Sequence, residues 1–238
     1  MILLDPDAML VVGHRGASGE CPENTVRSFD RALEQQADAL EFDVRVTADG
    51  VPVVIHDDTV DRTTSGSGLV RSLSLEQLQT LDAGDGQRVP TLDEVLQRYP
   101  DTPCIIEIKE PAASQPALEA VVRQDASGRV LIGSFIHAAL KPFAAAGLHR
   151  SASRRETALS WAASRIGLTV PGSGFEAFTV PERHRSLRIV DRALVRAARR
   201  ARRPVHVWTV DDPADAERLR DLGVSGIITN YPSRMRSG

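Results

Sequence analysis

Five short clusters of reactive side chains lie within the first 110 residues, beside the ends of strand-like segments. They are His14-Arg15-Gly16, Glu23-Asn24, Glu41-Phe42-Asp43, His56-Asp57 and Glu107-Ile108-Lys109. A parallel barrel gathers the ends of its strands, and therefore such clusters, at one mouth. The clusters combine carboxylates that bind cations, basic groups that bind phosphate and imidazoles that transfer protons. This set suits metal-assisted cleavage of a phosphodiester.

Three carboxylates, those of Glu41, Asp43 and Glu107, form the predicted metal site. Residues two apart in a strand share a face, so Glu41 and Asp43 project together, as do Glu107 and Lys109. Carboxylate oxygens from two strands suit a hard divalent cation such as Mg²⁺ or Ca²⁺ better than zinc, which prefers nitrogen and sulfur ligands. The alternative is an internal ion-pair network with Arg15 and Lys109, but such burial tends to lose more in desolvation than pairing returns.

Two basic residues and two histidines complete the predicted site. Arg15 offers a bidentate donor to a phosphate and Lys109 a point charge, which together offset the negative charge that makes a phosphodiester a poor electrophile. His14 and His56 titrate near neutrality, so one can take a proton from the attacking oxygen while the other protonates the leaving alcohol. A single histidine at a strand end is more often structural, but two that converge on one acidic cluster favour catalysis.

Short apolar runs alternate with helical patterns along the chain. The candidate strands are residues 9–13, 39–46, 51–56, 103–109, 130–134, 148–152, 177–180, 205–210 and 226–229. The candidate helices are residues 25–35, 92–99, 116–124, 137–146, 156–164, 191–202 and 213–222. About eight strand-helix units in roughly 250 residues predict a TIM barrel, an α/β fold. An open doubly wound sheet is the alternative, disfavoured because no GxGxxG or Walker loop follows an early strand.

One connection is too short for a parallel crossover, which needs about a dozen residues. Thr47-Ala48-Asp49-Gly50 separates two strand candidates, which predicts an antiparallel hairpin that turns at Asp49-Gly50. A register centred on that turn brings His56 opposite or nearly opposite Asp43, with Cβ atoms roughly 5 Å apart. Residues 57–90, which contain a short helical pattern at 75–81, are interpreted as an insertion at the barrel mouth, so residues 1–238 form one domain.

Composition excludes several classes of protein. The 238 residues, 42% hydrophobic and 26% charged, carry a formal net charge of −3, which gives no electrostatic footprint for nucleic acid. The basic run at 199–203 is interpreted as the solvated end of a helix. Nothing resembles a signal peptide, and no apolar run approaches the roughly 18 residues of a membrane span, so we expect a soluble cytoplasmic protein. Cys21 and Cys104 lack a CxxC spacing and are expected to be free thiols on opposite faces of the barrel.

The order and spacing of these motifs resemble those of the glycerophosphodiester phosphodiesterases. The resemblance spans about residues 10 to 232, is specific in the front half and loose over 111–203. The motifs that carry it are His14-Arg15-Gly16, Pro22-Glu23-Asn24-Thr25, Glu41-Phe42-Asp43-Val44, His56-Asp57-Asp58, Arg62-Thr63-Thr64, Glu107-Ile108-Lys109, Trp208-Thr209-Val210 and Gly226-Ile227-Ile228-Thr229-Asn230-Tyr231-Pro232.

This resemblance implies a TIM-barrel hydrolase that cleaves glycerophosphodiesters, such as glycerophosphocholine or glycerophosphoethanolamine, to sn-glycerol 3-phosphate and an alcohol. It implies metal ligands at Glu41, Asp43 and Glu107, acid and base catalysis by His14 and His56, and phosphate binding by Arg15 and Lys109. The first nucleophile is either a glycerol hydroxyl, through a cyclic phosphate, or water, and the sequence does not choose between them.

Three further residues are given supporting roles. Glu23 and Asn24 are expected to support the site from outside, although Asn24 could instead cap the following helix. Trp208 is expected to form a wall of the glycerol or leaving-group pocket, with plain barrel core as the alternative. The chain departs from the family pattern at Asn230, where many members have Asp, and in a basic loop at 183–185 that would suit an anionic leaving group, a lipid surface or an ordinary charged exterior.

Two other functions stay open at this point. A lysophospholipase D-type lipid phosphodiesterase would share every catalytic residue, but no long apolar loop suggests membrane insertion. A catalytically silent barrel that binds phosphoesters is disfavoured because every residue that the mechanism needs is present. The leaving alcohol, the choice between Mg²⁺ and Ca²⁺, the oligomeric state and the pathway have no readable motif. The expected partner is therefore a small glycerophosphodiester substrate.

Overall fold

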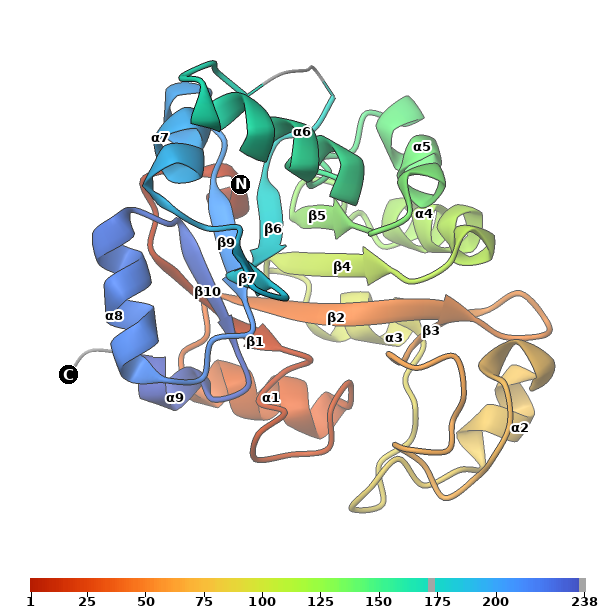
Figure 1. Ribbon diagram of the computed structural model, residues 1–238. Coiled ribbons are helices and arrows are strands. Elements are labelled where there is room, and N and C mark those ends of the chain that lie inside the picture. Colours follow the sequence, from red (N-terminus) through yellow and green to blue (C-terminus); the bar gives the residue numbers. More distant parts are fainter. Residues whose placement is uncertain (171–173, 236–238) are drawn as a thin grey trace.

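Seven parallel strands surround a common interior, and helices pack on their outer side (Figure 1). The computed structural model describes residues 1–170 and 174–235. Neighbouring strands follow the order β5-β4-β2-β1-β10-β9-β6 around the barrel. Their bounds are β1 (Leu10–His14), β2 (Ala39–Val46), β4 (Cys104–Ile108), β5 (Val130–Gly133), β6 (Phe178–Pro181), β9 (Val205–Trp208) and β10 (Gly226–Thr229).

Arg150 and Ser151 close the ring between β5 and β6. Parallel bridges join Ile132 to Arg150 and Ser151 to Ala177. The strand predicted at 148–152 is therefore present only as these bridges, in the position of the eighth strand. The nearly closed parallel ring confirms the predicted TIM barrel, and the alternative of an open doubly wound sheet is wrong.

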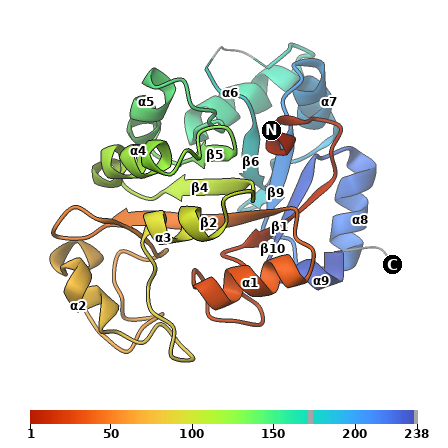
Figure 2. The same ribbon diagram turned by 180° about the vertical axis from the view of Figure 1, so that it is seen from behind.

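Helices follow most strands at the predicted places (Figure 2). They are α1 (Val26–Glu34), α3 (Leu92–Arg98), α4 (Ser114–Arg123), α5 (His137–Ala145), α6 (Arg154–Arg165), α7 (Arg192–Arg200), α8 (Pro213–Leu222) and the short α9 (Pro232–Met235), with 3-10 turns η1 (Ile2–Leu4) and η3 (Pro111–Ala113). Polar side chains define where several helices begin: Ser153 accepts a hydrogen bond from the backbone N–H of Glu156, and Asp191 from those of Ala193 and Leu194.

Alternation along each strand separates the barrel interior from the layer beneath the helices. In β2, Leu40, Phe42 and Val44 pack in the outer core with residues of α1, α3 and α4. The interior core is a smaller cluster: Leu3, Leu10, Val12, Ala39, Ile105, Leu131, Ala177 and Ile228. Further along the same inward-facing series as Ala39 come Glu41 and Asp43, and Glu107 follows Ile105. The interior is therefore apolar at one end and charged at the carboxyl ends of the strands.

The predicted hairpin is present between β2 and β3 (Pro52–Val54), which pair antiparallel with Val44 opposite Val54. Residues 57–90 follow, with η2 (Val70–Ser72) and α2 (Leu75–Gln79), and they lie to one side of the barrel (Figure 2). This segment has its own apolar cluster, Val53, Ile55, Val60, Val70, Leu78, Ala83 and Val89. The interpretation of 57–90 as an insertion within one domain stays a prediction.

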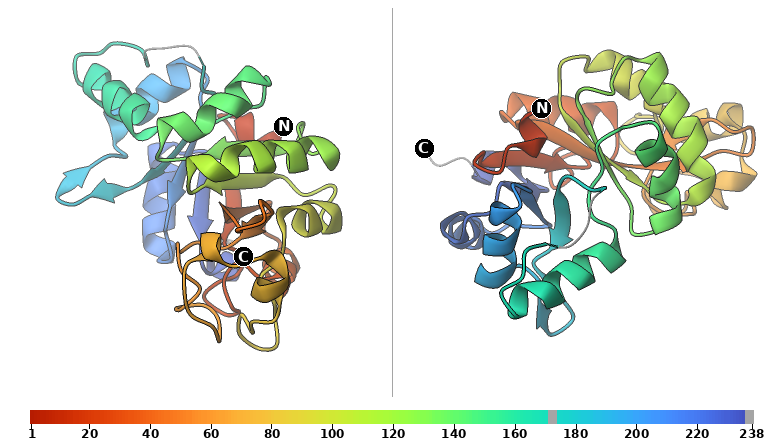
Figure 3. Two further views of the ribbon diagram at one scale, coloured as in Figure 1. Left: turned by 90° about the vertical axis from the view of Figure 1, so that its right-hand side faces the viewer. Right: turned by 90° about the horizontal axis from the view of Figure 1, so that it is seen from above.

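A second hairpin was not predicted from the sequence. It pairs β7 (Arg183–His184) with β8 (Leu187–Arg188) and projects from the barrel beside α6 (Figure 3, left). Its three basic residues at 183–185 are all exposed. Unlike the barrel strands, this hairpin has no buried side chain, so no apolar alternation marks it in the sequence.

The remaining expectations concern the basic run, the cysteines and the membrane. Arg199 and Arg200 at the end of α7, and Arg202 after it, are exposed as predicted, whereas Arg203 is partly buried over the Phe175 ring. Cys104 is buried and Cys21 partly exposed, and both are free thiols. No helix in residues 1–170 and 174–235 is long and apolar enough to cross a membrane.

Candidate active site

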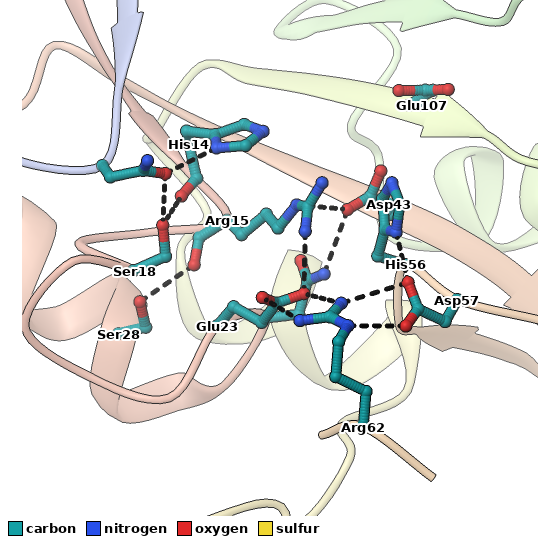
Figure 4. A network of polar contacts seen from close by, with 12 residues as sticks. His14, Arg15, Ser18, Glu23, Ser28, Asp43, His56, Asp57, Arg62 and Glu107 are labelled. Atoms are coloured by element: carbon teal, nitrogen blue, oxygen red, sulfur yellow. Dashed lines mark hydrogen bonds and ion pairs between the residues drawn. The ribbon is translucent and has the colours of Figure 1, made fainter. Parts of the chain in front are cut away.

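The predicted site residues meet at the carboxyl ends of the strands, and Figure 4 shows His14, Arg15, Asp43, His56 and Glu107 among them. His14 ends β1 and Arg15 follows it, while Glu41 and Asp43 come from β2 and Glu107 from β4. His56 follows β3 and lies one residue beyond the position opposite Asp43, because the Asp43 carbonyl accepts from the Ile55 N–H at 3.0 Å. The structure thus brings together every residue predicted to bind metal, to bind phosphate or to transfer protons.

The three predicted metal ligands form a compact acidic cluster. One carboxylate oxygen each of Glu41, Asp43 and Glu107 lies within 4.8 Å of the others. Burial, and then the neighbouring carboxylates of Asp43 and Glu107, raise the pKa of Glu41 well above its usual value. Burial likewise raises the pKa of Glu107. Carboxyl groups whose ionised forms are disfavoured in this way are typical of a site that could hold a divalent cation.

Arg15 and Lys109 both contact the cluster. Burial opposes ionisation of Asp43, but Lys109 Nζ at 3.4 Å and Arg15 Nε at 3.1 Å outweigh it, so the pKa of Asp43 is lowered. Lys109 Nζ also lies 3.0 Å from Glu107 Oε1. The ion-pair network considered as an alternative is therefore present, but within residues 1–170 and 174–235 no Arg or Lys forms an ion pair with Glu41. That carboxylate accepts the backbone N–H of Arg15 at 3.1 Å and lies 3.9 Å from His14 Nε2, neither of which is a permanent cation.

His14 has a neutral partner. Its Nδ1 lies 2.7 Å from Asn230 Oδ1, and Asn230 Nδ2 donates to Asp211 Oδ2 at 2.7 Å. Because the carboxylate can only accept, the amide is fixed with its oxygen toward His14, and Nδ1 must carry the proton. Burial and then the charge of Arg15 lower the pKa of His14. The neutral ring therefore directs the Nε2 lone pair toward the acidic cluster.

His56 has a charged partner instead. Its Nδ1 lies 2.6 Å from Asp57 Oδ1. Arg62 donates from Nε to Asp57 Oδ2 at 2.6 Å, and these hydrogen bonds hold the pKa of Asp57 well below its usual value. Asp57 therefore stays ionised beside the imidazole. A carboxylate in this position fixes the orientation of the His56 ring through its contact at Nδ1.

Glu23 joins the two halves of the network. It accepts from Arg15 Nη1 at 2.8 Å and from both terminal nitrogens of Arg62 at 2.8 Å (Figure 4). Asn24 Nδ2 donates to Asp43 Oδ2 at 3.1 Å. Asn24 is not the cap of α1, because Thr25 takes that place by accepting from the Ser28 N–H. Glu23 thus contacts the predicted phosphate-binding residue Arg15, and Asn24 contacts the predicted metal ligand Asp43. Their support of the reaction stays a prediction.

The loop after β1 holds Arg15 in an unusual backbone conformation. Arg15 and Asn24 have φ of 52° and 59°, and Gly16 has φ of 86°. A Cβ on Gly16 would lie 2.5 Å from the Ser28 carbonyl carbon, so only glycine allows this loop to pack against α1. Ser28 Oγ also donates to the Arg15 carbonyl at 2.9 Å. Left-handed residues held in this way are typical of functional sites.

No role was predicted from the sequence for three residues that contact the site, namely Ser18, Arg62 and Asp211. Asp211 orients Asn230, Ser18 Oγ lies 2.7 Å from Asn230 Oδ1, and Arg62 links Glu23 to Asp57. Arg62 belongs to a motif of the family resemblance, and Asp211 follows the end of β9, where barrel enzymes place functional residues. The motif around Arg62 and the place of Asp211 after a strand end are the sequence signals that could have identified these two residues.

A pocket of about 520 Å³ opens from this cluster. His14, Arg15, Glu41, His56 and Lys109 line one end of it. Trp208 also lines the pocket and is only partly buried, although it packs on the interior core as well. Its place agrees with the expected pocket wall, and its role in substrate binding stays a prediction.

Comparison with known proteins identifies the family. The model of the glycerophosphoryl diester phosphodiesterase family matches residues 14–234. A glycerophosphodiester phosphodiesterase of Caldanaerobacter subterraneus is 36% identical, over 95% of this chain and 96% of its own. A putative enzyme of the same name from Bacillus subtilis is 38% identical, over 94% of this chain and 95% of its own.

Solved structures agree in fold. A putative glycerophosphoryl diester phosphodiesterase of Silicibacter pomeroyi has a TM-score of 0.81 and 27% identity, over 98% of this chain and 94% of its own. An Oleispira antarctica phosphodiesterase, solved in complex with the product sn-glycerol-3-phosphate, has a TM-score of 0.78 and 27% identity, over 95% of this chain and 94% of its own. With a family match that begins at His14 itself and relatives that align along nearly their whole length, this chain belongs to the glycerophosphoryl diester phosphodiesterase family.

Proposed function

We propose that this protein is a metal-dependent hydrolase that converts glycerophosphodiesters to sn-glycerol 3-phosphate and an alcohol. The observation that carries the proposal is the pair of histidines with different partners at one acidic mouth, His14 on the amide of Asn230 and His56 on the carboxylate of Asp57. Family membership and the product bound by the Oleispira antarctica relative support the substrate class.

The carboxylates of Glu41, Asp43 and Glu107 would hold the metal, which we propose to be Mg²⁺ or Ca²⁺. Their fit is supported by three oxygens within 4.8 Å and by the raised pKa of Glu41, whose side chain forms no ion pair with an Arg or Lys among the described residues. An all-oxygen donor set is the one that these hard cations prefer. When bound, such a cation offsets the charge of the phosphate and makes its phosphorus easier to attack.

Arg15 and Lys109 are proposed to bind the phosphate. Both side chains line the pocket. Arg15 is held by Glu23 and Asp43, and Lys109 by Asp43 and Glu107, so little freedom is lost when they bind a further anion. Fixed cations stabilise the charge that develops on the phosphoryl oxygens in the transition state.

The partners of the two histidines support different proposed roles. Neutral His14 accepts at Nε2 the proton of the attacking oxygen, whether that oxygen belongs to water or to a substrate hydroxyl. His56, whose ring is oriented by Asp57, gives a proton to the leaving oxygen as the P–O bond breaks. The proton that His14 takes up balances the proton that His56 gives away. After one displacement His14 is therefore protonated and His56 is neutral.

The test is release of glycerol 3-phosphate from glycerophosphocholine and glycerophosphoethanolamine by the purified chain. We expect release with Mg²⁺ or Ca²⁺, its loss in excess EDTA and its return when metal is restored. A Glu107→Gln variant should need more metal for half-maximal rate, because it weakens the cluster without removing a side chain. Binding of the diesters without release by folded protein would favour a silent phosphoester-binding barrel.

A further inference from the structure

The pocket continues beyond the catalytic groups into a second region, which we call the α6 arm. Six side chains define it: Phe135, Thr157, Trp161, His184, Leu187 and Trp208. They come from the loop after β5, from α6, from the β7-β8 hairpin and from the end of β9. The arm therefore lies where the substituent of a phosphodiester bound at Arg15 and Lys109 would extend.

The β7-β8 hairpin is built as a wall of this arm. Arg183 pairs with Arg188 and His184 with Leu187, and paired residues share one face of a hairpin. The His184-Leu187 pair lines the pocket, whereas the arginine pair does not. Trp161 Nε1 donates to the Arg188 carbonyl at 3.2 Å, which ties the hairpin to α6. The wall thus presents one apolar and one titratable side chain to the pocket.

Guanidinium groups lie over two aromatic rings of the arm, those of Phe135 and Trp161. Arg154 Cζ lies 5.5 Å from the centre of the Phe135 ring, and Arg165 Cζ lies 3.8 Å from that of Trp161. Phe135 and Trp208 meet edge to face, with ring centres 5.7 Å apart. A quaternary ammonium group needs an open aromatic face or a carboxylate. Here two of the rings, Phe135 and Trp161, already have a guanidinium over them, and Trp208 packs against Phe135.

The charges of the lining also oppose a cationic group. Among the described residues that line the pocket, the carboxylates are Glu41 and Glu107, both assigned to the metal. The arm carries Arg154 at its edge and His184 in its wall, and no carboxylate of its own. An ammonium group placed there would be desolvated without a counter-ion, which is unfavourable. An uncharged apolar group would lose nothing comparable and would gain from burial.

We infer that the α6 arm selects glycerophosphodiesters whose substituent is uncharged and apolar over those with choline or ethanolamine. This inference rests on the proposed function for its substrate, and it assigns the arm as a specificity site. Leu187 and Phe135 are the side chains expected to contact the substituent, since both are at least 42% exposed and line the pocket.

The test compares two diesters of the same shape, glycerophosphocholine and its 3,3-dimethylbutyl analogue, in which carbon replaces the ammonium nitrogen. We expect kcat/KM to be at least about tenfold higher for the uncharged analogue, because only the cation is desolvated unpaired. A Leu187→Glu variant supplies a carboxylate and should move the ratio toward choline by about tenfold or more. The matched control is Leu159→Glu, on α6 and 53% exposed but outside the pocket lining, which should leave the ratio unchanged.

Binding separates this inference from the proposed function. Calorimetry with phosphocholine and 3,3-dimethylbutyl phosphate requires no turnover, and we expect the uncharged ligand to bind more tightly. Equal or tighter binding of phosphocholine, or a choline preference in kcat/KM, would overturn the inference. If neither diester is hydrolysed but 3,3-dimethylbutyl phosphate still binds more tightly than phosphocholine, the result would contradict the proposed function and support the proposed selectivity of the α6 arm.

Discussion

At the scale of single residues, the two histidines differ in what lies behind each ring. An amide stands behind His14 and a carboxylate behind His56. An amide gives no charge to stabilise an imidazolium, whereas a carboxylate does. This difference in partners is the reason for proposing His14 as the base and His56 as the acid.

Exchange of Asp211 and Asn230 tests the role of the amide. The double variant Asp211→Asn/Asn230→Asp can keep the hydrogen bond between the two side chains while it moves the negative charge next to His14 Nδ1. Burial and Arg15 lower the pKa of His14 in the native chain, so a carboxylate partner should raise it. Because a base works only when unprotonated, the acidic limb of the pH profile of kcat/KM should move upward by about one unit or more.

Thermal unfolding and the basic limb serve as controls for that exchange. The midpoint of unfolding should change little, since the hydrogen-bond pattern is conserved. An acidic limb that stays in place, with the double variant active and folded, would show that Asn230 does not tune His14.

The residue types of the site could be predicted from the sequence, but several of their partners could not. Glu41, Asp43 and Glu107 follow from strand alternation, and the two histidines from their positions beside strand ends. The contact between His14 and Asn230 joins residues 216 apart. It depends on β1 and β10 being neighbours in the closed ring, which local patterns do not encode.

At the scale of elements, residues 57–90 contribute a side chain that contacts the candidate active site. Arg62 reaches from this segment to Asp57 and Glu23, and Glu23 in turn contacts Arg15. The Arg62 guanidinium thus connects Asp57, the partner of His56, with Glu23, the partner of Arg15. The segment is positioned by its own apolar cluster, which packs on β3.

An Arg62→Gln variant measures what this connection contributes. Without the guanidinium, Glu23 and Asp57 lose their charged donor and are free to move, so kcat/KM should fall about 10- to 100-fold, as for other outer partners of a catalytic site. Arg71→Gln is the matched control, because Arg71 is exposed on the same segment and away from the pocket lining. Equal activities of the two variants and the native chain would exclude a role for Arg62.

Helices were easier to predict than the irregular strands. Seven predicted helices are present within a few residues of their expected bounds, because amphipathic spacing and caps such as Thr91 and Ser153 are local signals. The strand at 148–152 holds only the bridges at Arg150 and Ser151. The β7-β8 hairpin is exposed throughout, so neither its formation nor its place beside the pocket is determined by hydrophobic pattern.

At the scale of the whole molecule, the first residues close the end of the barrel opposite the site. Leu3 of η1 is fully buried in the interior core with Leu10 and Ile228. His206 of β9 is also fully buried, and its Nε2 lies 2.9 Å from the Leu3 carbonyl, which makes Nε2 the donor. No group in the described part of the chain hydrogen-bonds to His206 Nδ1, so a proton there would be buried unsatisfied.

This contact predicts a pH-dependent stability. Burial, against the hydrogen bond to Leu3, lowers the pKa of His206 to about 4. The unfolded chain, with an ordinary pKa of about 6.5, binds more protons between these values, so the contribution is complete above about 6.5 and is lost as pH falls toward 4. Urea unfolding of the native chain should lose about 1.4 kcal/mol more per pH unit in this window than unfolding of a His206→Leu variant. Parallel pH curves for the two proteins would refute the assignment.

The division of labour between His14 and His56 is tested most directly by varying the leaving group. The measurement compares kcat/KM of the native chain, His14→Ala and His56→Ala with glycerophosphocholine and with the p-nitrophenyl diester of glycerol phosphate, in saturating metal. A p-nitrophenolate needs no proton to depart, so His56→Ala should lose about 100- to 10,000-fold on the choline diester but far less on the aryl diester. His14→Ala should lose comparable activity on both. Equal losses of kcat/KM for His56→Ala on the two substrates would contradict the proposed roles. So would near-native kcat/KM of His14→Ala on the aryl diester. Absence of hydrolysis of either diester by the folded native chain would contradict the proposed function itself.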